Sequence, residues 1–173
     1  MKFNLDYYDR NTANWPIYKL QYALVASRHP LPLRKEDSMD KHLLDKARDL
    51  INANYISTTL STVSKNYDVN IAVITVLEMV DDQTIICARF GADKTYANLK
   101  ETGKGVFLVL LTPDGKSKDG IRVYVELLTD PQEGEYYDRI KARLANTAYS
   151  AFPLKNCLVF KIIDILPISM LKK

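Results

Sequence analysis

The feature that most constrains the fold is a change of hydrophobic periodicity after residue 54. From there on, segments rich in β-branched residues alternate with short turns, which predicts strands. Six strands are predicted, at 55–64, 69–79, 84–89, 106–112, 121–128 and 158–166. Strands joined by tight turns pair antiparallel. Six of them in one short stretch of chain favour a closed or nearly closed barrel, because closure removes exposed edges.

The segment 69–79 differs from the other predicted strands in being almost continuously apolar. This pattern is typical of a strand that is buried on both faces. The apolar segments 71–76 and 106–111 present more apolar surface than a thin layer of helices covers. A self-complementary interface with a second copy would bury the remainder, so we expect a homodimer.

Three helices are predicted around the strands. Apolar residues recur at spacings of three and four over 41–54, with Ser38 or Asp40 as a candidate N-cap. A shorter helix is predicted at 95–100, ended by Gly103, and a third at 133–149. The chain is thus expected to be mainly β with α, an α+β domain.

The first 40 residues differ in composition from the rest of the chain. They hold three of the seven prolines and a high density of aromatic residues, whereas disordered segments are usually poor in aromatics. We therefore interpret 1–40 as an N-terminal arm that packs on the body or on a partner subunit, and 41–173 as the barrel domain. A loosely attached tail is the alternative.

Charge and cysteine content narrow the classes of function. The net charge of +3 and the absence of a basic cluster argue against a nucleic-acid-binding barrel, which needs a basic groove with stacking aromatics. The two cysteines, Cys87 and Cys157, have no metal-ligand spacing and form no disulfide framework, so a reducing cytoplasm is expected. No apolar run is long enough to span a bilayer, and no membrane association is expected.

Side chains for acid–base, nucleophilic or metal chemistry do not gather into a recognisable motif. His29 and His42 both precede the barrel, and neither has a metal partner at a useful spacing. Cys87 lies in an apolar strand and is expected to be a buried hydrophobe. The pair Asp81-Asp82 fits a turn better than a catalytic dyad. The chain would therefore need a cofactor to perform a reaction.

One polar pair, Lys94-Thr95, stands out because it follows the third predicted strand and opens a short helix. A cation and a hydroxyl at a helix N-terminus can hold a phosphate, since free backbone N–H groups and the helix dipole point at it. A capped helix start with a solvated lysine is the alternative, and spacing alone does not decide between the two.

A resemblance to a known family rests on the order of five segments. They are Leu-Ser-Thr-Val-Ser at 60–64, Val-Asn-Ile-Ala-Val at 69–73, the acidic turn at 81–86, Asp-Lys-Thr-Tyr-Ala-Asn-Leu at 93–99, and the strand at 106–110. In this order they resemble the pyridoxamine 5′-phosphate oxidase-like FMN-binding split barrel, and the resemblance extends over about residues 50–168.

The resemblance implies a six-stranded antiparallel split β-barrel with flanking helices, which forms a homodimer and binds FMN at the subunit interface. Flavin contacts map to the second and third predicted strands, and phosphate contacts map to the pair Lys94-Thr95. The implied cofactor-binding residues are Ala72, Val73, Ile74, Thr75, Cys87, Ala88, Lys94 and Thr95. Arg89 and Arg122 are candidates for additional phosphate contacts.

The chain departs from the oxidase at three positions. Ala72, Leu77 and Asp93 stand where the oxidase carries basic residues, and charge-assisted contacts to a phosphate are the strong ones. These losses argue against pyridoxamine phosphate as substrate. Two hypotheses remain: an FMN-dependent oxidoreductase whose substrate and electron donor are unknown, or a flavin- or deazaflavin-binding protein without turnover.

Overall fold

The computed structural model describes residues 39–53, 58–111 and 119–168, all within one unit that spans 38–173. The predicted N-terminal arm, with His29, lies almost entirely outside the described residues, so its packing stays a prediction.

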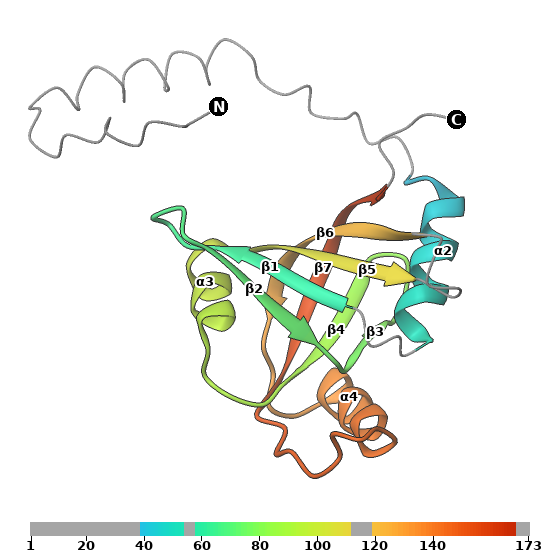
Figure 1. Cartoon of the computed structure of the whole chain (residues 1–173). Helices are drawn as coiled ribbons and strands as arrows, with labels where there is room; N and C mark the ends of the chain where they lie inside the picture. Colours follow the sequence, from blue (N-terminus) through green and yellow to red (C-terminus); the bar gives the residue numbers. More distant parts are fainter. Residues whose placement is uncertain (1–38, 54–57, 112–118, 169–173) are drawn as a thin grey trace, which may run out of the picture. The chain divides into compact units, whose positions relative to one another are not determined.

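Seven antiparallel strands form one curled sheet in the described part of the chain (Figure 1). Across the sheet the strands lie in the order β2-β1-β5-β6-β7-β4-β3. Their bounds are Thr58–Val63 (β1), Val69–Ile74 (β2), Leu77–Met79 (β3), Thr84–Arg89 (β4), Lys104–Leu111 (β5), Asp119–Thr129 (β6) and Asn156–Pro167 (β7). The predicted α+β split-barrel architecture is confirmed, with seven strands where the sequence predicted six.

The additional strand comes from the segment 69–79, which was predicted as one strand buried on both faces. It divides into β2 and β3, which form the two opposite edges of the sheet. Along β2, Val69, Ile71 and Val73 are 67%, 66% and 69% exposed in the single chain. The prediction was wrong because two short strands with different surroundings follow one another without a polar turn between them.

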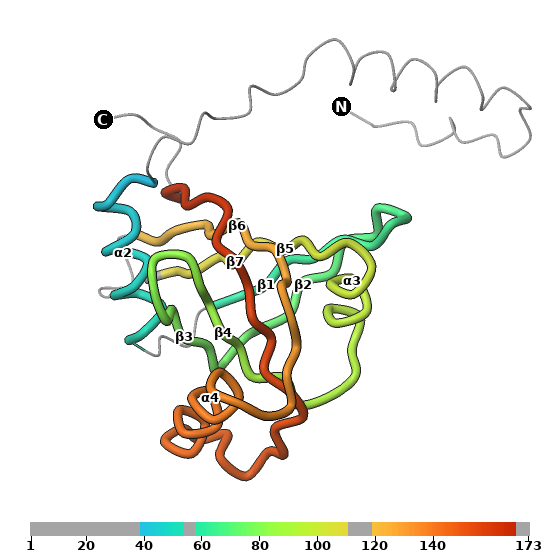
Figure 2. Tube along the Cα trace, turned by 180° about the vertical axis from the view of Figure 1, so that it is seen from behind, coloured from blue at the N-terminus to red at the C-terminus, as the bar shows by residue number. Residues whose placement is uncertain are grey.

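The connection between β2 and β3 brings the two edges of the sheet together. Only Thr75 and Val76 join the strands, and the carbonyl oxygen of Val76 accepts a hydrogen bond of 2.9 Å from the backbone N–H of Ala88. The end of β2 therefore lies beside the end of β4, as the two views of the trace show (Figures 1 and 2).

Within the described residues, three helices flank the sheet: α2 (Lys41–Asn52), α3 (Lys94–Thr102) and α4 (Glu135–Ala145). They contact different strands, α2 mainly β3 and β7, α3 mainly β1 and β2, and α4 both β4 and β7. Asp40 caps α2 by accepting a 2.9 Å hydrogen bond from the backbone N–H of His42. Gly103 ends α3 at φ +71°, a left-handed conformation that favours glycine. The predicted helices are thus present in the described residues.

The main hydrophobic core lies on the inner face of the curled sheet. Leu60, Phe107 and Val123 are register partners on β1, β5 and β6, and all three are fully buried. The ring of Phe107 meets that of Phe160 edge-on at 5.4 Å between centroids. A second buried cluster, which includes Ile140, attaches α4 to the sheet.

Candidate functional site

A pocket of about 140 Å³ lies where the two edges of the sheet meet. Its walls come from the end of β2, the end of β4 and the start of α3. It is lined by Leu60, Ala72, Val73, Ile74, Thr75, Cys87, Ala88, Arg89, Phe90, Gly91, Asp93, Thr95, Tyr96 and Leu158. Eight of the ten residues proposed from the sequence are in this set, although they come from segments far apart along the chain.

The two remaining candidates, Lys94 and Arg122, do not line the pocket in the single chain. Lys94 is exposed at the first position of α3. Arg122 lies on β6, where its Nη2 donates a 3.0 Å hydrogen bond to the carbonyl oxygen of Pro167. Their contribution to cofactor binding stays a prediction.

The start of α3 is built around Asp93. Its side chain caps the helix by accepting a 2.7 Å hydrogen bond from the backbone N–H of Tyr96. The Thr95 side chain is buried, and its hydroxyl accepts a 2.8 Å bond from Nδ2 of Asn70. This cap explains why an acidic residue stands at position 93, where the oxidase carries a basic one. The Asp93 carboxylate accepts a hydrogen bond from a backbone N–H group that could otherwise bind a phosphate.

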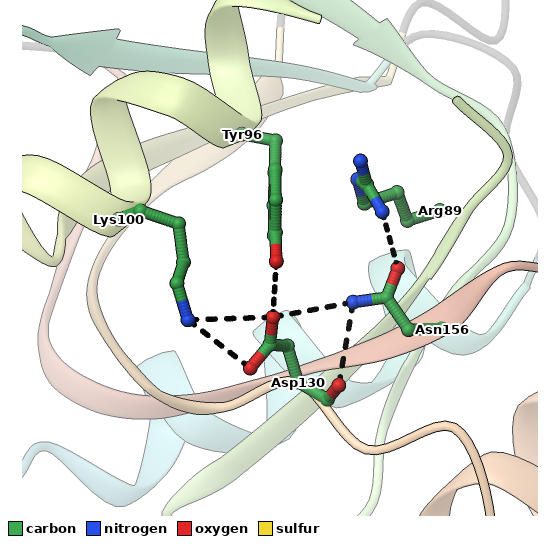
Figure 3. Close-up of polar contacts among 5 residues, drawn as sticks. All are labelled: Arg89, Tyr96, Lys100, Asp130 and Asn156. Carbon is green, nitrogen blue, oxygen red and sulfur yellow. Dashed lines mark hydrogen bonds and ion pairs between the residues drawn. The ribbon is translucent and has the colours of Figure 1, made fainter. Parts of the chain in front are cut away.

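Arg89 is the last residue of β4 and lines the pocket. Figure 3 shows its side chain with those of Asn156 and Tyr96. Its Nη1 donates a 2.7 Å hydrogen bond to Oδ1 of Asn156, and its guanidinium carbon lies 3.6 Å from the centre of the Tyr96 ring. Its Nε is buried without a hydrogen-bond partner. No ion pair involves Arg89 within the described part of the chain.

Asp130 lies behind this arginine and is bonded to other side chains. Its carboxylate accepts a hydrogen bond from the Tyr96 hydroxyl and pairs with Nζ of Lys100 at 3.3 Å. These contacts, the Tyr96 bond foremost, hold the pKa of Asp130 below its usual range, and the same bond raises the pKa of Tyr96. Nδ2 of Asn156 donates to Asp130 at 3.4 Å, so the Asn156 amide separates Asp130 from Arg89 (Figure 3).

The two acidic groups that line the pocket are already bonded elsewhere, Asp93 in the cap of α3 and the Tyr96 hydroxyl to Asp130. Cys87 is buried as predicted, and burial raises the pKa of its thiol, which keeps the group protonated at neutral pH. Asp81 serves the turn before β4, where it accepts a 2.8 Å hydrogen bond from the Gln83 N–H. No cluster of three or more His, Cys, Asp or Glu side chains suited to a metal ion occurs among the described residues.

An apolar surface adjoins the pocket on the outer side of the sheet. Exposed Val69, Ile71 and Val73 form one row along β2, and Val73 also lines the pocket. Next to Val69 lies a groove of about 470 Å³, lined mainly by β1, β5 and β6. Its apolar members include Val63, Val69, Val106, Tyr124 and Ile163.

Comparison with solved structures identifies the family. An FMN-binding protein from Syntrophomonas wolfei subsp. wolfei is 66% identical, and the match covers 91% of this chain and 99% of that one with a TM-score of 0.73. The chain belongs to the pyridoxamine 5′-phosphate oxidase-like FMN-binding split-barrel family.

More distant structures share the split-barrel fold. HupZ of Group A Streptococcus is 20% identical over 73% of this chain and 94% of its own, with a TM-score of 0.60. A candidate pyridoxamine 5′-phosphate oxidase from Lactobacillus delbrueckii is 13% identical over 78% and 97%, with a TM-score of 0.53. No family model and no curated protein matches the chain.

Among the described helices, none is long and apolar enough to cross a membrane.

Part of this split-barrel site was not foreseen from the sequence. Tyr96 directly follows the Lys94-Thr95 pair, so its position at the start of the same predicted helix could have identified it. Asp130 and Asn156 lie in segments far from it along the chain, and only the pairing of β4 with β7 places Asn156 opposite Arg89. No local pattern could have connected them.

Proposed function

We propose that the chain binds FMN in the pocket between β2, β4 and α3, and that it acts as a flavin-dependent oxidoreductase. The observation that carries the proposal is the convergence of residues 72–75 and 87–89 on one pocket whose wall holds Arg89, an arginine with no ion pair among the described residues. The 66% identity to a protein described as FMN-binding supports it independently.

The side chains around the pocket fit such a ligand. A phosphate monoester carries nearly two negative charges at neutral pH, and Arg89 offers it Nη2 and a buried, unpartnered Nε. Leu60, Ala88 and Leu158 supply apolar contacts for a planar ring. Lys94, exposed at the start of α3, is proposed as a further phosphate contact from the family resemblance. Arg122 is proposed as a cation that compensates for the basic residues this chain lacks.

We further propose that two copies of the chain form a homodimer with the flavin at the interface. Ligand pockets usually enclose 300–1,000 Å³, whereas this one has about 140 Å³ in the single chain. Val73 joins the pocket to the exposed apolar row of β2, so a second copy seated on that row would also wall the pocket.

When bound, a flavin supplies hydride or electron transfer. The residues of this chain hold it and exclude water, and none of the described pocket side chains is poised as a general acid or base. The two buried, unpaired thiols Cys87 and Cys157 support a reducing, cytoplasmic setting.

A flavin- or deazaflavin-binding protein without turnover is the second candidate. It is favoured by Ala72 and Asp93, which line the pocket where the oxidase carries basic residues. The two candidates differ in one measurement, the reduction of bound flavin by a nicotinamide or deazaflavin donor.

The test starts with the absorbance spectrum of the purified full-length protein and the identity of any flavin released on heat denaturation. We expect flavin bands and released FMN, or stoichiometric uptake of added FMN by the colourless protein. A protein that neither carries nor takes up FMN contradicts the proposal. Bleaching of the bound flavin by a donor supports the oxidoreductase, and binding without bleaching supports the second candidate.

A further inference from the structure

We infer that Asn156 is a positioning residue, which holds Arg89 toward the pocket with its charge unneutralised so that the guanidinium recognises the phosphate of FMN. This inference rests on the proposed function and extends it to two residues outside the pocket, Asn156 and Asp130. It begins from the contrast between Arg89 and Asp130, two opposite charges that lie near each other without forming an ion pair.

The first step is the orientation of the Asn156 amide. Asn156 is 2% exposed, and both ends of its side chain are bonded. Oδ1 accepts from Nη1 of Arg89 at 2.7 Å, while Nδ2 donates to the carboxylate of Asp130 at 3.4 Å and to its backbone carbonyl at 3.3 Å. The acceptor end of the amide therefore faces the arginine, and the donor end faces the aspartate.

The second step concerns what this neutral link does to the charge of Arg89. A carboxylate at position 156 would form a direct ion pair with the guanidinium, whereas the amide holds it without cancelling its charge. Asp130 is meanwhile bonded to Tyr96 and Lys100. Arg89 is the one cation among the residues that line the pocket in the described chain, so its free charge sets the preference for an anion there.

The third step is the stack on Tyr96. The guanidinium lies 3.6 Å from the ring centre, and the ring is itself fixed by its hydroxyl bond to Asp130. Stacking on one face and the Asn156 bond at one edge leave Nε and Nη2 of Arg89 available. An arginine with two fixed contacts loses less conformational freedom on binding a phosphate than a free one.

The experiment compares FMN with riboflavin, which has the same ring system without the phosphate. Affinities of the full-length apoprotein for both are measured by quenching of flavin fluorescence. The variants are Arg89→Gln, the isosteric Asn156→Asp, and the two combined. Lys155→Gln is the matched control, because it removes an exposed positive charge next to Asn156 that does not line the pocket.

We expect wild type and Lys155→Gln to prefer FMN over riboflavin to the same extent. Arg89→Gln and Asn156→Asp should each weaken FMN binding by about 10- to 100-fold with little change for riboflavin, the range of a hydrogen bond to a charged group. In the Arg89→Gln background, Asn156→Asp should have little further effect, because Asn156 acts through Arg89. Retained riboflavin binding shows that the pocket of each variant is folded.

Three results would overturn the inference without touching the proposed function. They are equal affinity of the wild type for FMN and riboflavin, an unchanged FMN preference in Arg89→Gln, and additive losses in the double variant. Failure of the wild type to bind either flavin overturns the proposed function as well.

Discussion

The guanidinium of Arg89 lies 3.6 Å from the centre of the Tyr96 ring, and the hydroxyl of the same tyrosine bonds Asp130. One ring thus contacts a cation through its face and an anion through its hydroxyl. The two interactions can be separated, because phenylalanine keeps the face and removes only the hydroxyl.

Tyr96→Phe should therefore be milder than Tyr96→Leu. We expect the phenylalanine variant to lower the free energy of unfolding by about 1 kcal/mol through the lost hydrogen bond. The leucine variant should lose a further 0.5–2 kcal/mol, roughly the range of a cation–π contact. Urea unfolding followed by circular dichroism measures both, and equal losses in the two variants would show that the stack contributes nothing.

Acid should destabilise the fold partly through Asp130. Its pKa in the folded protein is lowered from the ordinary 3.8, chiefly by the Tyr96 hydrogen bond. A lowered pKa contributes stability that is present above pH 3.8 and is lost as the pH falls through the folded value. Asp130→Asn should flatten the fall in unfolding free energy below about pH 5. Asp68→Asn, which removes an exposed carboxylate in the β1–β2 turn, is the matched control.

Gly120 should not tolerate a side chain. A Cβ at this position would lie 2.2 Å from the carbonyl oxygen of Val109, and the φ of +157° adds strain. We expect Gly120→Ala to lower the free energy of unfolding by at least about 2 kcal/mol. Gly91→Ala, where no atom lies within 4 Å of the added Cβ, should change it by less than about 0.5 kcal/mol. Similar losses at both positions would contradict this.

A charge on the outer row of β2 should produce a monomer. Ile71 is 66% exposed in the single chain and does not line the pocket. Ile71→Glu should therefore shift the sedimentation coefficient from dimer to monomer while the circular dichroism spectrum stays unchanged. Phe152→Glu changes an apolar residue of similar exposure away from β2 and should leave the dimer intact. A wild type that sediments as a monomer at micromolar concentration rules out the dimer.

Both thiols should resist modification in the native state. Burial raises the pKa of Cys157 to about 12 and raises that of Cys87 as well, so neither forms the reactive thiolate at neutral pH. We expect no reaction with a thiol-specific disulfide reagent at pH 7.5, and two equivalents per chain in denaturant. Rapid reaction of one native thiol would indicate that β4 or β7 opens locally.

The fold could be predicted where hydrophobic periodicity and turn residues together mark the strands. The exception is the segment 69–79. Turn residues separate most strands, so their number and order could be read from the sequence. Only Thr75 and Val76 separate Ile74 from Leu77, with no Gly, Pro, Asn or Asp to mark a turn, and the division there results from sheet topology rather than local preference. Hydrophobic periodicity reports only on neighbours along the chain. It therefore does not reveal that β2 and β3 lie on opposite edges of the sheet.

The candidate site was predicted in part for the same reason. Residues 72–75 and 87–89 lie on strands whose family resemblance is carried by local sequence, and the structure brings them to one pocket. The surroundings of Arg89 were not foreseen, because its partner Asn156 and the nearby Asp130 approach it only through the pairing of β4 with β7 and the loop after β6. Charged residues that lie far apart along the chain produce no spacing pattern in the sequence that would reveal their proximity in the fold.

The connection at Thr75 and Val76 has a consequence for ligand size. Because these two residues alone join the outermost strands, the separation of the pocket walls is determined by the span of a few peptide bonds. An insertion there would widen the opening but would also displace Val76, which is 1% exposed in the second buried cluster, whereas substitutions on the walls adjust only its chemistry. The size of the molecule that this scaffold admits is therefore tied to the packing of one buried residue.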